Sequence, residues 1–179
     1  LEERLSTDIL RTVQEGDADL GVCTSPTPVS DLQTRLYRRD RLVLVVPRGH
    51  ALALQTAVPF ESTLSFDHVG LHSNSAIYLA TSRAAAAAGK PLRLRIQVTG
   101  LDAMCRMIHN GLGIGLLPDR AFDMLRHMGD LQAVTLTDDW AARDIQLVAR
   151  DFDALPVTAR LLADHLCANA PDQAIKIHH

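Results

Sequence analysis

The side chains of this sequence that could do chemistry are mainly hydroxyls, placed before expected helices or at the ends of expected strands. They are Ser6, Thr24 with Ser25, residues 73–75, and Thr99 with its neighbour Gly100. In an open α/β sheet, ligands lie outside the carboxyl ends of the strands. Hydroxyls and free N–H groups at helix N-termini bind carboxylates and other anions there. Each hydroxyl alone is more often a helix cap than a ligand contact. Several of them at one edge nevertheless predict a cleft for a small molecule.

Patterns typical of catalysis or metal binding are missing from the sequence. No serine lies in a G-x-S-x-G turn, and Cys105, four residues before His109, belongs to the apolar stripe of its expected helix. The histidines show no HExxH spacing, and His68 and His72, if on one strand, would be about 13 Å apart. We therefore expect no catalytic residue, no metal and no cofactor. An enzyme would have to use Asp102 or His72, which are the acid–base candidates at the expected cleft.

The glycines at positions 111, 113 and 115 have the spacing of a dinucleotide-binding loop but stand in the wrong order of elements. They follow an expected helix and open an expected strand, whereas a phosphate-binding loop follows a strand and opens a helix. We interpret these glycines as a helix end and a close helix–strand contact. No nucleotide cofactor is therefore predicted.

Length and composition describe an ordinary globular chain. Its 179 residues are 47% hydrophobic and 22% charged, which is enough to bury a core without disulfides. With 18 basic and 21 acidic residues the net charge is −3, a poor basis for holding a phosphate backbone. Cys23, Cys105 and Cys167 are widely spaced among apolar neighbours, which favours buried thiols in the cytoplasm. No apolar run approaches the roughly 18–20 residues that span a membrane.

The periodicity of apolar residues predicts helices that alternate with strands. Helices are expected over residues 6–16, 75–88, 101–111, 121–128 and from 156 to about 166. Strands are expected over residues 19–23, 32–36, 42–47, 68–72, 92–98, 113–117, 131–136 and 145–150. The strand at 42–47 is aliphatic throughout, which is typical of a strand covered on both faces. This alternation predicts the α/β class with a mostly parallel sheet.

Three segments resemble the effector-binding domain of LysR-type transcriptional regulators. They are residues 15–22 (EGDADLGV), 40–53 (DRLVLVVPRGHALA) and 98–118, which includes LDAM and GLGIGLLP. The three occur in the order and spacing of the family, and the resemblance runs from residue 1 to about 168. The family domain begins earlier, with a strand and a helix. We therefore expect that the N-terminal strand is missing here and that the chain is a fragment of a longer polypeptide.

The resemblance implies two Rossmann-like lobes joined by two crossover strands, the type 2 periplasmic-binding-protein fold. Lobe I would hold residues 1–55 and 133–168, lobe II residues 56–132, and residues 169–179 would be a tail. An effector would lie between the lobes. The residues that the family pattern places around it are Ser6, Thr24, His72, Ser73, Ile77, Thr99 and Gly100. Many family members place an arginine in the cleft for an anionic ligand, whereas this sequence has Thr24 where one might look. We therefore expect either a neutral or weakly charged effector, or binding by helix N-termini alone.

The resemblance also implies a function. The chain would be the effector-binding and dimerisation domain of a cytoplasmic transcription regulator, with no role at a membrane. It would reach DNA only through a separate N-terminal winged helix-turn-helix domain that this chain does not contain. The helices from Ser6 and Ser75 would pack against a partner subunit in a homodimer or tetramer. The alternative is a solute-binding protein of a transporter, which shares the fold but should carry an export signal and act as a monomer.

Overall fold

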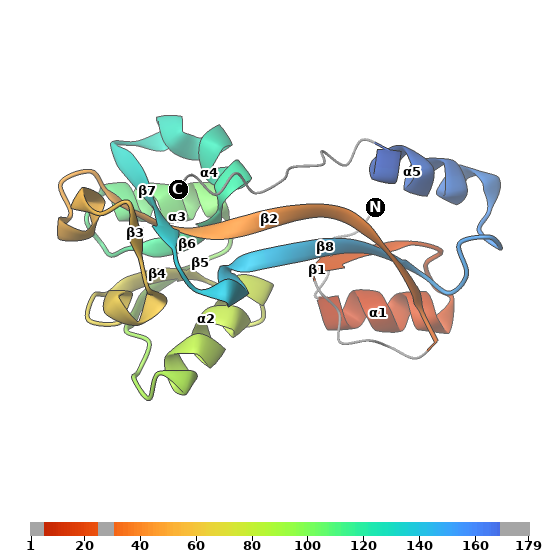
Figure 1. Cartoon of the computed structure of the whole chain (residues 1–179), viewed down its shortest axis with the longest axis horizontal. Coiled ribbons are helices and arrows are strands. Elements are labelled where there is room, and N and C mark those ends of the chain that lie inside the picture. Colours follow the sequence, from red (N-terminus) through yellow and green to blue (C-terminus); the bar gives the residue numbers. More distant parts are fainter. Residues whose placement is uncertain (1–5, 25–30, 169–179) are drawn as a thin grey trace. The chain divides into compact units, whose positions relative to one another are not determined.

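The computed structural model describes residues 6–24 and 31–168, so Ser25 and the expected tail lie outside the described residues. The chain divides into two compact units, the first made of Leu1–Arg39 with Arg143–His179 and the second of Asp40–Ala142. Two long strands belong in part to each unit (Figure 1). Strand β2 (Gln33–Pro47) leads from the first unit into the second, and β8 (Ala142–Ala149) leads back.

The first unit contains helix α1 (Ser6–Glu15), strand β1 (Gly21–Thr24) and helix α5 (Val157–Ala168) besides its parts of β2 and β8. Its strand order is β1-β8-β2, and β1 pairs antiparallel with β8. The predicted apolar stripe of α1 is confirmed, because Val13 is buried with Cys23 and Val148. Gly16, with φ +84°, ends the helix in the left-handed conformation that glycine adopts readily.

The second unit is built around the inner part of β2. Strands β6 (Gly115–Pro118) and β7 (Leu131–Leu136) both pair antiparallel with it, and β3 (Ala57–Val58) pairs parallel with β7. Strands β4 (His68–Leu71) and β5 (Leu94–Val98) form a parallel pair. Its α-helices are α2 (Ala76–Ala87), α3 (Leu101–His109) and α4 (Asp119–Leu125). Short 3-10 helices are η1 (Ala51–Leu54), η2 (Phe60–Thr63), η3 (Arg126–Met128) and η4 (Asp139–Ala141).

The aliphatic run of β2 is covered on both faces, as its sequence predicts. Leu42, Leu44 and Val46 pack in one buried cluster, whereas Val43 and Val45 pack in another. Successive side chains of a strand point to opposite faces, so this division follows directly from the period of two. Each of these side chains is at most 9% exposed.

Two expectations about the strands are wrong. The strands pair in a mixed rather than a mostly parallel way. The pairs β1 with β8, β2 with β6 and β2 with β7 are antiparallel, whereas β3 with β7 and β4 with β5 are parallel. The strands expected at 32–36 and 42–47 are one continuous strand. Its polar middle stays extended while two of its charged side chains, those of Arg39 and Arg41, find partners on neighbouring strands. Arg39 pairs with Asp144 at 3.1 Å, and Arg41 donates to the Leu136 carbonyl at 2.6 Å.

The two units do not coincide with the expected lobes. Residues 40–55 and 133–142 belong to the second unit. The physical reason is the core, since Leu44, Leu52 and Val134 share one buried cluster with Phe60. The lobe boundaries stay a prediction.

None of the helices in the described ranges has the length and apolar character that crossing a membrane requires.

Candidate functional site

Most of the predicted site residues come together at one edge of the second unit. Strands β4 and β5 run parallel with Leu71 opposite Val98, so the residues that follow, His72 and Thr99, leave the sheet side by side. Helix α2 starts soon after the first strand and α3 directly after the second. We call His72, Ser73, Thr99 and Gly100 the β4–β5 edge. The parallel register thus brings together two segments that are more than 20 residues apart in the sequence.

The hydroxyls at residues 73–75 have different roles. Ser75 is the N-cap of α2, and its hydroxyl accepts a hydrogen bond from the Tyr78 N–H at 3.1 Å. Its own N–H donates to the His72 carbonyl at 2.9 Å, which closes the turn. Ser73 is exposed, and its hydroxyl has no hydrogen-bond partner within the described ranges. Ser73 is therefore the hydroxyl of this turn that a ligand can use.

The start of α3 offers backbone donors rather than a side-chain cap. Gly100 is the N-cap in an extended conformation, and no side chain caps the helix from this position. The first N–H groups of a helix lack partners within it and attract hydrogen-bond acceptors. However, Asp102 lies over Gly100, since a Cβ there would come 2.7 Å from its Oδ1 atom. A strongly anionic ligand would meet this carboxylate, so the helix end suits a neutral acceptor better.

Ser6 and Thr24 belong to the first unit. Ser6 is the first residue of α1 and Thr24 the last residue of β1, where it is opposite Ile145 of β8. Both are half-buried. Their expected place at the same cleft as the β4–β5 edge stays a prediction.

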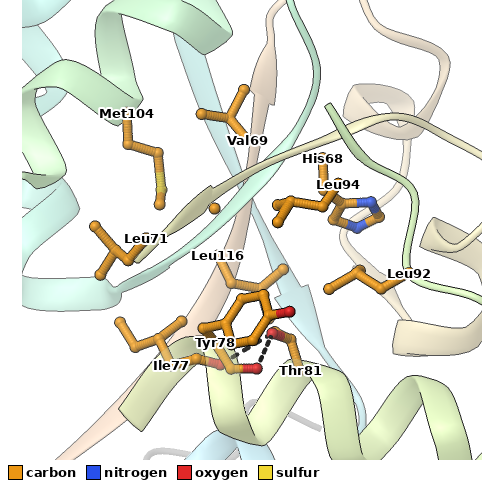
Figure 2. Close-up of a pocket in the computed structure, with 11 residues that line it drawn as sticks. His68, Val69, Leu71, Ile77, Tyr78, Thr81, Leu92, Leu94, Met104 and Leu116 are labelled. Atoms are coloured by element: carbon orange, nitrogen blue, oxygen red, sulfur yellow. Dashed lines mark hydrogen bonds between the residues drawn. The ribbon is translucent and has the colours of Figure 1, made fainter. Parts of the chain in front are cut away.

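A cavity lies in the second unit between α2 and the β4–β5 pair (Figure 2). Its lining includes Leu71, Ile77, Thr81, Leu94 and Met104. The cavity holds about 20 Å³, whereas about 10–15 Å³ on this measure accommodates one water. As it stands, the cavity is too small for a whole metabolite and large enough for one small group.

Sequence reasoning missed most of this cavity and recognised only Ile77. The signal that could have pointed to it is the spacing of Ile77 and Thr81, which share one helix face at i and i+4. A buried threonine fits there because its hydroxyl bonds the carbonyls of Ile77 and Tyr78 at 3.0 and 2.8 Å. The cavity itself depends on how strands and helices pack, which no local pattern reveals.

Burial holds three titratable groups, His68, Cys23 and Cys105, in their neutral forms. Burial lowers the pKa of His68 to about 4, although its hydrogen bond to the Phe66 carbonyl and the charge of Asp67 oppose the change. Burial raises the pKa of Cys23 to about 11, and burial followed by the charge of Asp102 raises that of Cys105. Both thiols are therefore unreactive at neutral pH. Their expected burial is confirmed, whereas Cys167 is only half-buried.

The two acid–base candidates, His72 and Asp102, are both exposed near the β4–β5 edge. Asp102 lies in the first turn of α3, and His72 follows β4 directly. Within the described ranges, no group of three or more histidine, cysteine or acidic side chains could hold a metal ion.

Comparison with known proteins matches the chain to one family. A family model described as "LysR substrate binding domain" matches residues 1–170. A curated relative from Shigella flexneri, the "Uncharacterized HTH-type transcriptional regulator YfeR", is 25% identical over 164 residues, which are 92% of this chain and 53% of the relative. The chain therefore spans about half the length of that relative.

Solved structures show the same fold. The CcmR regulatory domain of Synechocystis PCC6803, in complex with 2-PG, matches with a TM-score of 0.80 and 19% identity, over 93% of this chain and 80% of that one. The effector-binding domain of QuiR, in complex with shikimate, matches with a TM-score of 0.75 and 16% identity, over 92% and 78% of the two chains. A reduced form of OxyR from N. meningitidis matches with a TM-score of 0.75 and 17% identity, over 94% of this chain and 78% of that one. The predicted α/β fold with two periplasmic-binding-protein-like lobes is thereby confirmed.

Proposed function

This chain belongs to the LysR substrate-binding domain family, and we propose that a small molecule bound to it controls DNA binding by a separate winged helix-turn-helix domain. The family match and the curated relative both concern transcriptional regulators. A solute-binding protein of a transporter is therefore not favoured. The same relatives are regulators rather than enzymes, and the proposal gives His72 and Asp102 no catalytic role.

The proposed effector site combines the β4–β5 edge and Ile77 with Ser6 and Thr24 of the first unit. The observation that carries it is the parallel register of β4 and β5, which places two hydroxyl-bearing segments and two helix starts at one edge. Ligands of open α/β sheets bind at this kind of edge. Because Asp102 lies over Gly100, the edge supports a neutral or weakly charged effector with hydrogen-bond acceptors.

The proposed partners follow from the family. The domain would form a homodimer or tetramer in the cytoplasm, with the α1 and α2 helices at the contact between subunits. It would act on DNA only through the winged helix-turn-helix domain. Effector binding would shift the equilibrium between two arrangements of the domain, by no more than the difference in its affinity for them.

Thermal unfolding with a panel of small molecules tests the proposal. The panel should contain carboxylates, carboxamides, aromatics, amino acids and sugars. A compound that binds only the native state at 100 times its Kd stabilises it by about 2.7 kcal/mol, which raises Tm by several degrees. A panel without any saturable rise would count against a sensor of these chemical classes.

Variants then locate the site. Ser73→Ala and Thr99→Ala should weaken the effect of an active compound while Tm without ligand stays unchanged, because both side chains are exposed. Thr135→Ala is the matched control, since Thr135 is exposed on β7 and does not belong to the edge. Wild-type affinity in both edge variants would refute the assignment of the site.

A further inference from the structure

The cavity in the second unit adjoins the β4–β5 edge. Leu71, the last residue of β4, lines the cavity and directly precedes His72. Ile77 also lines it, and this residue lies in the first turn of α2. Figure 2 shows Leu71 and Ile77 at one end of the lining group, with His68 and Leu92 at the other. A molecule held at the edge therefore has one end of the cavity beside it.

Two polar side chains of the cavity wall, those of Thr81 and His68, already have hydrogen-bond partners. The Thr81 hydroxyl donates within its own helix, at 2.8 and 3.0 Å from two carbonyl oxygens (Figure 2). The ring nitrogens of His68 contact the Phe66 carbonyl at 3.1 Å and the Thr63 hydroxyl at 3.2 Å. A charged group in this mostly apolar cavity would find no oppositely charged side chain in the wall, which is unfavourable in an apolar environment. The cavity suits an uncharged, apolar occupant.

The dimensions of the cavity limit that occupant to a short chain. Its volume of about 20 Å³ accepts one small group without any movement, given the 10–15 Å³ or so that a single water needs. The Met104 side chain, with its rotatable bonds, can move to admit a second carbon. A methyl group therefore fits the cavity as it stands, an ethyl group fits once Met104 moves, and longer chains would require further side chains of the wall to move.

We propose, building on the proposed function, that the effector carries a short uncharged aliphatic group that fills this cavity while its polar part hydrogen-bonds to the β4–β5 edge. Apolar cavities of proteins stay dry and bind apolar groups, since the wall atoms regain contacts that an empty space denies them. Each CH₂ group buried in this way tightens binding about fourfold. The cavity therefore selects, among molecules with the same polar part, those with a methyl or ethyl substituent.

Xenon tests the cavity without an effector. In the full chain labelled with ¹³C at methyl groups, xenon should cause saturable NMR shifts of the Leu71, Ile77 and Met104 methyls. Thr81→Ile adds carbon to the wall and should abolish these shifts, whereas Thr81→Val keeps the volume and should retain them. All three side chains are β-branched, so the helix tolerates them similarly. If Thr81→Ile does not fold, Leu116→Phe fills the cavity from another wall. Unshifted methyls in the wild type, or equal shifts in a filled variant, would overturn the proposal.

A homologous series connects the cavity with the edge. The probes are acetamide, propionamide, butyramide and hexanamide, with the four matching carboxylates. Edge binding is followed by the backbone amide signals of Ser73, Thr99 and Gly100, and cavity binding by the methyl signals. In the wild type the affinity should rise about fourfold from the acetyl to the propionyl compound and should not rise further at the hexanoyl compound. Thr81→Ile should lose this gain, and Thr81→Val should keep it.

The two experiments fail in different ways. The role of the cavity in selectivity is refuted if each added carbon raises the affinity equally in Thr81→Ile and in the wild type. It is also refuted if the affinity of the wild type keeps rising up to the hexanoyl compound. If no probe shifts the edge amides while xenon enters the cavity, the placement of the effector site at the edge is refuted for amides and carboxylates of this kind, whereas the role of the cavity is tested separately by xenon.

Discussion

The stability of the second unit should depend on pH through one buried histidine. His68 is only 3% exposed, and its ring contacts the Phe66 carbonyl and the Thr63 hydroxyl. Its pKa falls from 6.5 to about 4 because burial disfavours the imidazolium, with partial opposition from Phe66 and from the charge of Asp67. The ring is therefore neutral in the folded protein at pH 7 and is still mostly neutral at pH 5.

The sign and size of the effect follow from proton linkage. Between the unfolded pKa of 6.5 and the folded pKa of about 4, the unfolded state binds more protons, so the free energy of unfolding falls as the pH falls. The loss begins near pH 6.5 and levels off below pH 4. The complete separation of the two pKa values corresponds to about 3 kcal/mol, of which about 2 kcal/mol is lost by pH 5.

Urea unfolding of three proteins at pH 7.5, 6 and 5 measures this loss. His68→Asn removes the titrating ring and keeps an amide that can hydrogen-bond, so its stability should fall by about 2 kcal/mol less than that of the wild type over this range. His127→Asn is the control, since His127 is exposed, and it should follow the wild type. His68→Asn will also be less stable at pH 7.5, so the comparison concerns the slope. Parallel curves for the wild type and His68→Asn would refute the reasoning.

The other predictions concern packing, capping and backbone conformation, and each is checked by urea unfolding at pH 7.5. Met104 is 1% exposed, so Met104→Ala should destabilise the protein by about 2–5 kcal/mol. Ser75→Ala removes the cap of α2 and should cost about 1 kcal/mol, whereas Ser73→Ala in the same turn should cost less than about 0.5 kcal/mol. Gly113 has φ +154°, and a Cβ there would lie 2.6 Å from a backbone carbonyl oxygen. Gly113→Ala should therefore cost about 3 kcal/mol or more, while Gly89→Ala, at φ +66° in open space, should cost about 1 kcal/mol. Equal losses of stability in Ser75→Ala and Ser73→Ala would contradict the capping role of Ser75. Equal losses in Gly113→Ala and Gly89→Ala would contradict the steric explanation at Gly113.

The fold was predictable as far as it depends on local patterns. Residues 42–47 form a doubly covered strand because every side chain is aliphatic, and β7 has the expected bounds, Leu131–Leu136. The pairing of β2 with β6 and β7 joins segments about 70–90 residues apart in the sequence, and no local pattern contains that information. For the same reason the polar residues 38–41 suggested a break, although Arg39 and Arg41 find partners on other strands.

The candidate site shows the same limit. The hydroxyls at the β4–β5 edge could be found because residue type and position before a helix are both visible in the sequence. The division of roles between Ser73 and Ser75 could not, because it depends on which hydroxyl reaches the Tyr78 N–H. The cavity was not predictable either. It exists because side chains of α2, α3, β4, β5 and β6 leave a small space where they meet.

In the proposed mechanism, affinity and response depend on different residues. The β4–β5 edge and the cavity both belong to the second unit, so their contacts with an effector are the same in any arrangement of the two units. Contacts that are equal in two states cannot shift the equilibrium between them. A change from 1:99 to 99:1 needs a difference of about 5.5 kcal/mol in binding, and in the proposed site residues of the first unit, such as Ser6 and Thr24, would have to supply it. Loss of those side chains should therefore reduce the response more than the affinity. Loss of Ser73 or Thr99 should reduce both together, because it removes binding itself.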